Sequence, residues 1–294
     1  MERRRASVGA TRPWKESVVD GVRLAYDDAG TGPPLLCLHA IGHGARDFGD
    51  LRAALGGRYR VLALDWPGQG NSGDDPVPAS AARYAELLSG FVEGLGIPEL
   101  VVLGNSIGGA AAVRFAVAAP RRVRGLVLVN PGGLDRVDRT ARLVTGAMTR
   151  FFRAGARRAW WYPTVFALYY RAVLPEAAAR AQRDRIVASA FEIAPVLTQA
   201  WSSFGRPDAD TRELATALRC LVFVAWAKKD RIIQLRRNRP TIDRIPNVRF
   251  EEFPAGHAPF LECPDRFRAS LEAFLVEVWA PGGARGDSHL RASA

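Results

Sequence analysis

Cysteine is scarce in this sequence, which contains three in 294 residues. Cys37, Cys220 and Cys263 lie far apart and form no Cys-x-x-Cys pair, and the first two fall inside strand-like apolar runs. This spacing excludes the dense disulfide framework of a small secreted protein and the usual cysteine sets of a zinc site. We therefore interpret all three as small buried hydrophobic residues and expect no metal site.

Long hydrophobic runs are also missing. No segment reaches the roughly 18 to 20 apolar residues that a helix needs to cross a bilayer. The arginines near the start of the chain are not followed by the apolar stretch of a secretory signal. These absences lead us to expect a cytoplasmic protein, and the length is sufficient for a large core with an inserted subdomain.

Acidic residues are fewer than basic ones, 30 against 41, which gives a formal net charge of +11. Clustered Lys and Arg would neutralise nucleic-acid phosphates. The arginines are spread over the whole chain, however, and no helix-turn-helix, RNP or zinc-finger spacing occurs. We therefore expect a small-molecule substrate and no nucleic-acid partner, and the sequence leaves the oligomeric state open.

The first half of the chain alternates short β-branched runs with helical stretches, and most of these runs are apolar throughout. Such strands are covered on both faces, which is typical of a parallel sheet with helices on either side. We predict an α/β fold. The expected strands are 21–30, 33–40, 59–66, 99–106, 123–133, 220–230 and 247–257, and the expected core helices are 46–55, 80–96, 108–120 and 264–280.

Between residues 134 and 217 this alternation stops, and the chain becomes helical, arginine-rich and aromatic. We predict an inserted helical cap there, on a core formed by residues 1–133 and 218–280. Residues 281–294 lack a periodic apolar face, and we expect them to form a flexible C-terminal tail.

The stretch "LVVLGNSIGGAAAVRFA" runs a buried strand into Gly104-x-Ser106-x-Gly108 and then into a helix rich in small residues. A G-x-S-x-G turn holds a serine above the sheet, because the small neighbours permit a tight, strained backbone. The amides and dipole at the helix N-terminus favour an alkoxide or oxyanion there. We predict that Ser106 is a nucleophile; the alternative is an ordinary strand-to-helix loop.

A serine hydroxyl needs a base, and the chain offers four histidines. His289 lies in the expected tail, whereas His39 and His43 follow a strand whose loop would approach Ser106. His257 follows the last strand and precedes the final helix, so it can reach the same sheet edge. We predict that His257 is the base; the alternative is a histidine that only holds the helix start.

The third member should be a carboxylate that fixes the imidazole tautomer and stabilises the imidazolium. Asp230 ends the strand before that of His257 and precedes the histidine by 27 residues. Both would emerge at the carboxyl edge of adjacent strands. We favour Asp230 over Asp135, which follows the preceding strand and is the competing candidate.

These motifs together resemble the α/β-hydrolase fold superfamily of serine hydrolases with a helical cap, in the order Ser106, Asp230, His257. The resemblance extends from about Ser17 to Trp279 and includes "GPPLLCLHAIG", "LDWPGQGNS", "GNSIGG", "WAKKD" and "GHAPFLECPDRF". It implies a mostly parallel sheet of about eight strands, no cofactor, and an oxyanion hole formed by the N–H of Ile107 and a loop amide, Ile41 first and Ala40 next. Ala40 departs from the His-Gly pair usual in this loop.

The inserted region resembles the helical cap that covers the active site in this family. We predict that His39 and the cap residues Met148, Phe151, Trp160, Phe166 and Trp201 bind substrate. Residues 159–170, "AWWYPTVFALYY", are too short to span a membrane. We favour an aromatic lid packed over an apolar pocket; the less favoured alternative is a helix lying in a lipid surface beside flanking arginines.

The resemblance implies an esterase-type hydrolase acting on a small, largely apolar ester or lactone through an acyl-enzyme. Aspartate-dependent relatives are disfavoured because the turn carries a serine. Carbon–carbon bond hydrolases of meta-cleavage pathways remain an alternative, since "GNSIGG" is close to their "GNSMGG", although Ala258 replaces the aromatic residue that usually follows their histidine. A binding protein that kept this fold without the chemistry is the third possibility.

Overall fold

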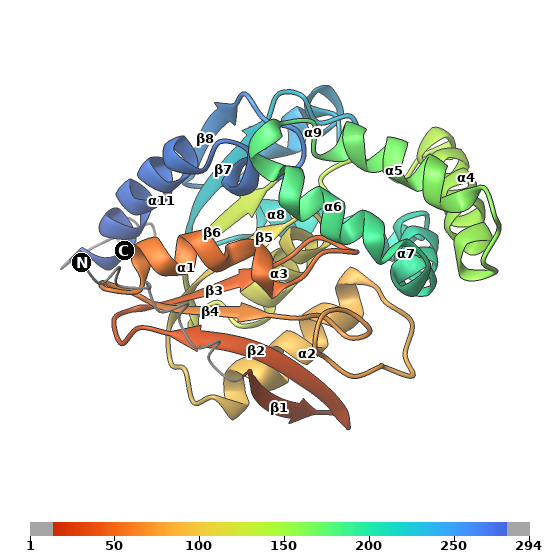
Figure 1. Ribbon diagram of the computed structural model, residues 1–294. Coiled ribbons are helices and arrows are strands. Elements are labelled where there is room, and N and C mark those ends of the chain that lie inside the picture. Colours follow the sequence, from red (N-terminus) through yellow and green to blue (C-terminus); the bar gives the residue numbers. More distant parts are fainter. Residues whose placement is uncertain (1–13, 281–294) are drawn as a thin grey trace, which may run out of the picture.

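The computed structural model describes residues 14–280 and contains one eight-stranded sheet (Figure 1). β1 (Lys15–Val19) with β2 (Val22–Ala29), and β2 with β4 (Arg60–Leu64), are antiparallel pairs, and all other neighbouring strands are parallel. The prediction of a mostly parallel α/β sheet of about eight strands is therefore confirmed. In spatial order the strands are β1 (Lys15–Val19), β2 (Val22–Ala29), β4 (Arg60–Leu64), β3 (Pro34–Leu38), β5 (Leu100–Asn105), β6 (Val123–Val129), β7 (Leu221–Ala227) and β8 (Val248–Phe253).

Strand β1 is the one strand that the hydrophobic pattern did not predict. It lies at the edge of the sheet, and most of its residues are exposed, so it lacks a continuous apolar run. Its turn into β2 is Asp20-Gly21, with φ of 49° and 77°. An Asp-Gly pair with both residues at positive φ is typical of a two-residue hairpin. That pair was therefore the available sequence signal for β1.

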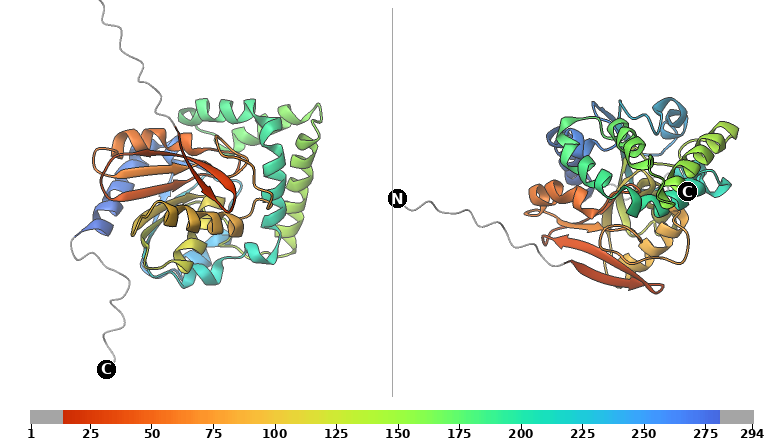
Figure 2. Two further views of the ribbon diagram at one scale, coloured as in Figure 1. Left: turned by 90° about the horizontal axis from the view of Figure 1, so that it is seen from below. Right: turned by 45° about the vertical axis from the view of Figure 1, so that its right-hand side comes forward.

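The core helices lie on both faces of the sheet (Figures 1 and 2). The central strands are apolar along their whole length because both faces are covered; all six residues of β5 are buried. Helices α2 and α3 pack against each other, and α11 packs against β6. These helices are α1 (Gly49–Leu55), α2 (Ala81–Gly94), α3 (Ile107–Ala118), α9 (Leu235–Ile242), α10 (Pro259–Glu262) and α11 (Pro264–Trp279).

The chain between β6 and β7 forms a helical insertion. Its long helices α4 and α7 pack side by side at the right of Figure 1. Aromatic side chains form its interior, where Phe152, Tyr162 and Phe166 are buried. The insertion contains α4 (Arg139–Ala156), α5 (Tyr162–Val173), α6 (Arg180–Ala188), α7 (Ala190–Phe204) and α8 (Arg212–Thr216). The predicted tail, 281–294, lies outside the described residues.

Candidate active site

Ser106 lies on a strained turn between β5 and α3. Its backbone has φ 57° and ψ −117°, which is unusual for a residue with a side chain. The turn is held by backbone hydrogen bonds from Ser106 N to Val129 O (3.0 Å) and from Gly132 N to Ser106 O (3.0 Å). The surrounding strands therefore fix a conformation that the isolated chain would disfavour.

The two glycines of G-x-S-x-G are needed because backbone atoms approach them closely. A Cβ at Gly104 would lie 2.5 Å from Gly108 O, and a Cβ at Gly108 would lie 2.6 Å from Leu38 O. Neither contact can be relieved by rotating a side chain, since both partners are backbone. The glycines let the first turn of α3 pack directly against the ends of β5 and β3.

His257 and Asp230 form a hydrogen-bonded pair at the neighbouring strand ends. His257 Nδ1 lies 2.7 Å from Asp230 Oδ2, and both side chains are buried. The two residues follow β8 and β7, which are adjacent and parallel. The structure thus brings together the histidine and carboxylate that the sequence singled out.

Three further groups hold the Asp230 carboxylate. Oδ1 accepts hydrogen bonds from the N–H of Ile232 (2.7 Å) and Ile233 (3.1 Å). Oδ2 accepts a bond from Asn130 Nδ2 at 2.5 Å, in addition to the imidazole. These bonds fix the position of the carboxylate beside the imidazole. Sequence reasoning missed Asn130, although its position directly after β6 places it at the same edge of the sheet.

The loop that carries His257 is fixed at its backbone as well. His257 N donates to Val173 O in the cap at 2.9 Å, and its carbonyl accepts a bond from Asn105 Nδ2 at 3.1 Å. Burial lowers the pKa of His257, but the charge of Asp230 and the hydrogen bond to it outweigh burial, so the pKa is raised overall. The imidazole is therefore a stronger base than an ordinary histidine.

Ser106 and His257 line the same cavity. Within residues 14–280, no hydrogen bond joins the Ser106 hydroxyl to the imidazole. Such bonds are often long in ligand-free enzymes and shorten when substrate binds. The geometry places the serine, the imidazole and the carboxylate at one rim of the sheet.

The loop after β3 lies beside the serine. Ala40, Ile41 and Ile107 all line the cavity. In the described part of the chain the N–H groups of Ile41 and Ile107 have no hydrogen-bond acceptor, whereas Gly42 N donates to Gln69 Oε1 at 2.6 Å. The left-handed conformation in this loop belongs to Gly42, at φ 78°, so alanine is tolerated at position 40.

His39, which the sequence suggested as a substrate-binding residue, does not line the cavity. Its side chain is buried outside the cavity lining. Its Nε2 accepts a hydrogen bond from Trp66 N at 3.0 Å, so Nδ1 carries the proton and donates to Ala40 O at 2.7 Å. Burial lowers the pKa of His39, which agrees with a neutral ring. Both nitrogens are occupied by backbone groups, and the ring serves to fix the loop.

A second histidine–carboxylate pair also borders the cavity. His43 Nδ1 lies 2.6 Å from Asp47 Oδ2, and both side chains are buried. His43 lines the cavity and lies beside Tyr170 of the cap, with ring centroids 5.9 Å apart. Unlike Asp230, Asp47 leaves its second oxygen, Oδ1, without a partner in the structure. Within residues 14–280, no group of three or more His, Cys, Asp or Glu is arranged to hold a metal ion.

The cavity lies between the sheet edge and the cap and has a volume of about 350 Å³. Of the predicted cap residues, Trp201 lines it. Met148, Phe151 and Phe166 do not; Phe166 is instead buried in the cap interior. Trp160 is 90% exposed, so its prediction as a lining residue was wrong. The apolar lining residues that sequence reasoning missed include Tyr169, Tyr170, Val173, Leu197, Phe204, Ile232 and Ile233.

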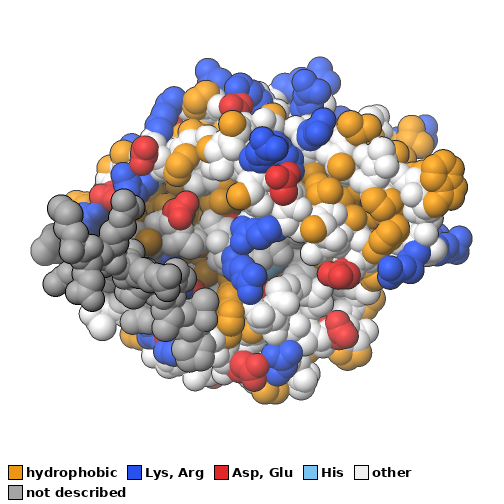
Figure 3. All heavy atoms as spheres, viewed as in Figure 1, with side chains coloured by type: hydrophobic (Ala, Val, Ile, Leu, Met, Phe, Trp, Pro, Cys, Tyr) orange, Lys and Arg blue, Asp and Glu red, His pale blue; other side chains and the backbone are white. Residues whose placement is uncertain are grey.

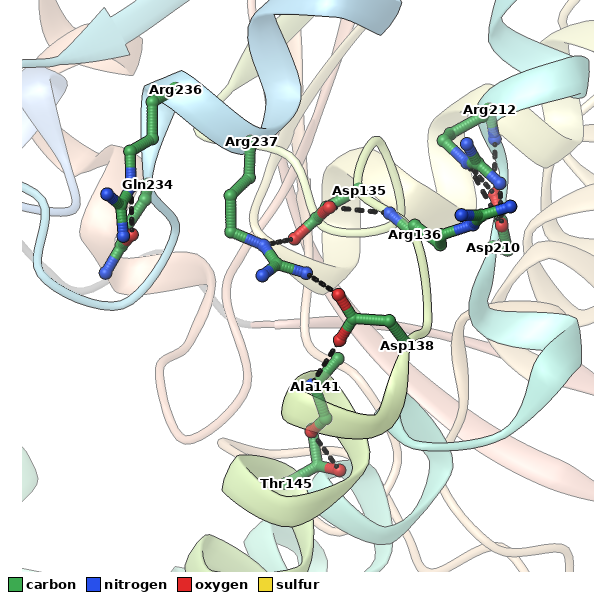
Figure 4. A network of polar contacts seen from close by, with 10 residues as sticks. All are labelled: Asp135, Arg136, Asp138, Ala141, Thr145, Asp210, Arg212, Gln234, Arg236 and Arg237. Atoms are coloured by element: carbon green, nitrogen blue, oxygen red, sulfur yellow. Dashed lines mark hydrogen bonds and ion pairs between the residues drawn. The ribbon is translucent and has the colours of Figure 1, made fainter.

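The charged residues Asp135, Arg136 and Arg237 also line the cavity and belong to a network of polar contacts (Figure 4). Arg237 of α9 forms ion pairs with Asp135 and Asp138, at the start of the cap. Asp138 also caps α4 by accepting a hydrogen bond from Ala141 N at 2.8 Å. Asp135, the competing acid, is thus engaged by an arginine of the core, while Asp230 is the carboxylate bonded to His257.

A strained serine between strand and helix, with a histidine and an aspartate at neighbouring strand ends, defines the architecture of an α/β hydrolase. A model of the alpha/beta hydrolase family matches residues 35–270, and the chain belongs to this family. No described helix is long and apolar enough to cross a membrane.

Named relatives within this family differ in their reactions. A 2-hydroxymuconate semialdehyde hydrolase of Pseudomonas putida is 29% identical over 282 residues, which cover 90% of this chain and 94% of the relative. A putative carbamate hydrolase, RutD, of Azorhizobium caulinodans is 28% identical over 257 residues, covering 87% and 96%. Among solved structures, a thermophilic esterase from Thermogutta terrifontis has the same fold, with a TM-score of 0.76, 23% identity, and coverage of 90% and 99%.

Proposed function

We propose that the protein is a serine hydrolase that cleaves small, largely apolar carboxylic esters or lactones. The observation that carries the proposal is the 2.7 Å bond from His257 to Asp230 beside a cavity that the strained Ser106 also lines. A nucleophile, a base and a group that orients the base are the parts that acyl transfer needs.

In this mechanism Ser106 Oγ bonds to the substrate carbonyl carbon while its proton passes to His257 Nε2. Asp230 holds Nδ1–H and stabilises the imidazolium. The tetrahedral intermediate collapses, the carbon–oxygen bond of the ester breaks, and His257 gives its proton to the leaving oxygen. Water then attacks the acyl-enzyme, again losing a proton to His257, and releases the acid and free Ser106.

The developing oxyanion would be bound by the N–H groups of Ile107 and Ile41. Both amides lack an acceptor among residues 14–280 and border the cavity, which supports this role. Removing one such donor typically costs about 2.7–4 kcal/mol in the transition state. Ala40, the other candidate from sequence, lies one residue earlier in the same loop.

Substrate size follows from the cavity. A volume of about 350 Å³, with a mostly apolar lining from the cap, suits a short or medium acyl group. The test is turnover of short p-nitrophenyl esters by the intact chain and by Ser106→Ala. We expect the variant to fold and to lose on the order of 10⁶-fold in kcat; comparable turnover by the variant would refute the proposal.

Carbon–carbon bond hydrolysis is the second candidate. It is supported by the likeness to the 2-hydroxymuconate semialdehyde hydrolase over almost the whole chain and by "GNSIGG" at the serine. Ala258, directly after the histidine, argues for the ester reaction. Incubation with a ring-fission dienone separates the two, because carbon–carbon cleavage would remove its visible absorbance. The putative carbamate hydrolase adds carbamates to the panel of substrates to be tested.

A further inference from the structure

The cap contains a long segment without acidic residues. Residues 139–175 include seven arginines and no aspartate or glutamate. This is unusual in a chain with 30 acidic residues spread over 294 positions. The segment forms α4, the following turn and α5, so its charge is concentrated on two adjoining helices. The arginines are Arg139, Arg142, Arg150, Arg153, Arg157, Arg158 and Arg171.

These arginines have no carboxylate partners. Among the ion pairs of residues 14–280, none involves any of the seven, whereas Arg237 at the cap boundary pairs with two aspartates. Arg158 lies over the ring of Phe191 at 5.0 Å from the centroid, which leaves its charge uncompensated. The outer surface of these helices therefore carries arginines that form no ion pair with any residue of the described chain.

Large apolar side chains are exposed among these arginines. Trp160 is 90% exposed, Leu143 71% and Leu168 59%. We call these three residues, with Val165 and the seven arginines, the cap patch. Hydrophobic side chains gather over the cap at the right of Figure 3, with Lys and Arg at the margins.

Helical periodicity explains how the cap patch forms. Leu143 and Arg150 are spaced by seven residues and share the outer face of α4, Arg157 follows at the same spacing as the C-cap of this helix, and Phe152 on the opposite side is buried. On α5, Leu168 faces outward and Phe166 inward. The two outer faces join at the turn that carries Trp160. The helices thus have an aromatic face toward the cap interior and an outer face that combines arginines with apolar side chains.

We propose that the cap patch docks the protein onto an anionic lipid bilayer surface. Arginines on such a surface are attracted to acidic headgroups, and tryptophan and leucine side chains insert at the boundary between headgroups and acyl chains. A nucleic acid would neutralise the arginines but would leave Leu143 and Leu168 in water. The combination of both side-chain types favours the lipid surface.

The position of the cap patch also bears on the substrate. Val144 and Thr145, next to Leu143 on α4, line the cavity, and Val144 is half exposed. One edge of the patch therefore borders the cavity. This inference rests on the proposed function and specifies its substrate class. The substrates would be apolar esters dissolved in the bilayer, which reach Ser106 from the docked face of the cap.

The test is flotation of the full chain with vesicles of phosphatidylcholine alone or with added phosphatidylglycerol, at low and high salt. We expect binding to the anionic vesicles and release by salt. The double variant Arg150→Glu with Arg153→Glu should lower the partition coefficient at least tenfold, since each basic residue near such a surface contributes about fivefold.

Matched controls distinguish the effect of the cap patch on vesicle binding from the effect of net charge. Arg46 and Arg121 are exposed outside the cap, so Arg46→Glu with Arg121→Glu makes the same change in net charge and should bind as the parent does. Trp160→Glu should weaken binding strongly. Val276→Glu, at an exposed apolar residue of α11, should not.

Several outcomes would overturn the proposal. These are equal loss in the control and patch variants, no binding to anionic vesicles, binding to duplex or single-stranded DNA in place of vesicles, or a dimer that Trp160→Glu converts to a monomer without any vesicle binding. Ser106→Ala should bind vesicles like the parent. Docking with no esterase activity would therefore refute only the proposed reaction, and esterase activity with no docking would refute only this inference.

Discussion

Asn105 Nδ2 donates a hydrogen bond to the carbonyl oxygen of His257, 3.1 Å away and 152 residues later in the chain. The same amide donates to Val129 O at 3.0 Å. The residue before the proposed nucleophile therefore holds the loop that carries the proposed base. Both contacts are buried, so neither is easily replaced by water.

Replacing this amide should affect both folding and positioning. Asn105→Ala leaves the buried carbonyl of His257 without its donor, while Val129 O keeps its bond from Ser106 N, and the loss should lower the free energy of unfolding by about 1–3 kcal/mol. The replacement should also lower kcat about tenfold with little change in KM, because the loop that carries His257 is no longer held in position relative to Ser106. Urea unfolding and ester kinetics well below the melting temperature measure the two effects. Unchanged kcat would show that Asn105 has only a structural role.

The two histidine–aspartate pairs can be distinguished by the same replacement at each. His257→Asn and His43→Asn both keep an amide N–H that can face Asp230 or Asp47. We expect His257→Asn to lower kcat about 10³-fold or more, since the base is lost, and His43→Asn to change it less than tenfold. The reverse order of effects would make His43 the base.

The raised pKa of His257 predicts the acid limb of the pH profile. The base must be neutral to accept a proton from serine, and a raised pKa keeps the ring protonated to higher pH. Activity should therefore fall as the pH drops through a value above 6.5, the ordinary pKa of histidine. In Asp230→Asn the burial effect remains without the opposing charge, so the limb should move to lower pH while kcat falls about 10⁴-fold. A limb below pH 6.5 in the parent would contradict this assignment.

Replacement of two glycines by alanine should change the free energy of unfolding in opposite directions. Gly108→Ala places a Cβ 2.6 Å from Leu38 O and should lower the free energy of unfolding by about 2–3 kcal/mol. Gly146 lies inside α4, and a Cβ there would meet no atom within 4 Å. Gly146→Ala should therefore raise the free energy of unfolding by about 0.5–1 kcal/mol. Equal effects of the two changes in urea unfolding would argue against the close packing at the serine turn.

The sequence predicted the fold and the residues at the strand ends because both depend on local pattern. Buried parallel strands are apolar throughout, and their carboxyl ends meet at one edge, so Ser106, Asp230 and His257 could be related from their positions alone. Asn130 follows the same logic but belongs to no short motif. His39 was misassigned because the pattern does not show that Trp66 N occupies its ring nitrogen.

The cap could not be predicted at the level of side chains. Trp160 and Phe166 are both large aromatic residues of one segment, yet one is exposed and the other buried. Which of them is buried depends on where the turn ends and α5 begins, and on how α4 packs on α7. Local composition contains neither fact. The lining by Tyr169, Tyr170 and Leu197 is therefore a result of tertiary packing.

Covalent labelling of the serine tests the central claim most directly. A fluorophosphonate reacts with an activated serine hydroxyl and adds one group of known mass. We expect a single adduct on the intact chain, located on Ser106 by peptide mass mapping and absent in Ser106→Ala. An unlabelled folded protein, or an adduct at another residue with Ser106 unmodified, would contradict the account and favour a binding protein that retains only the fold.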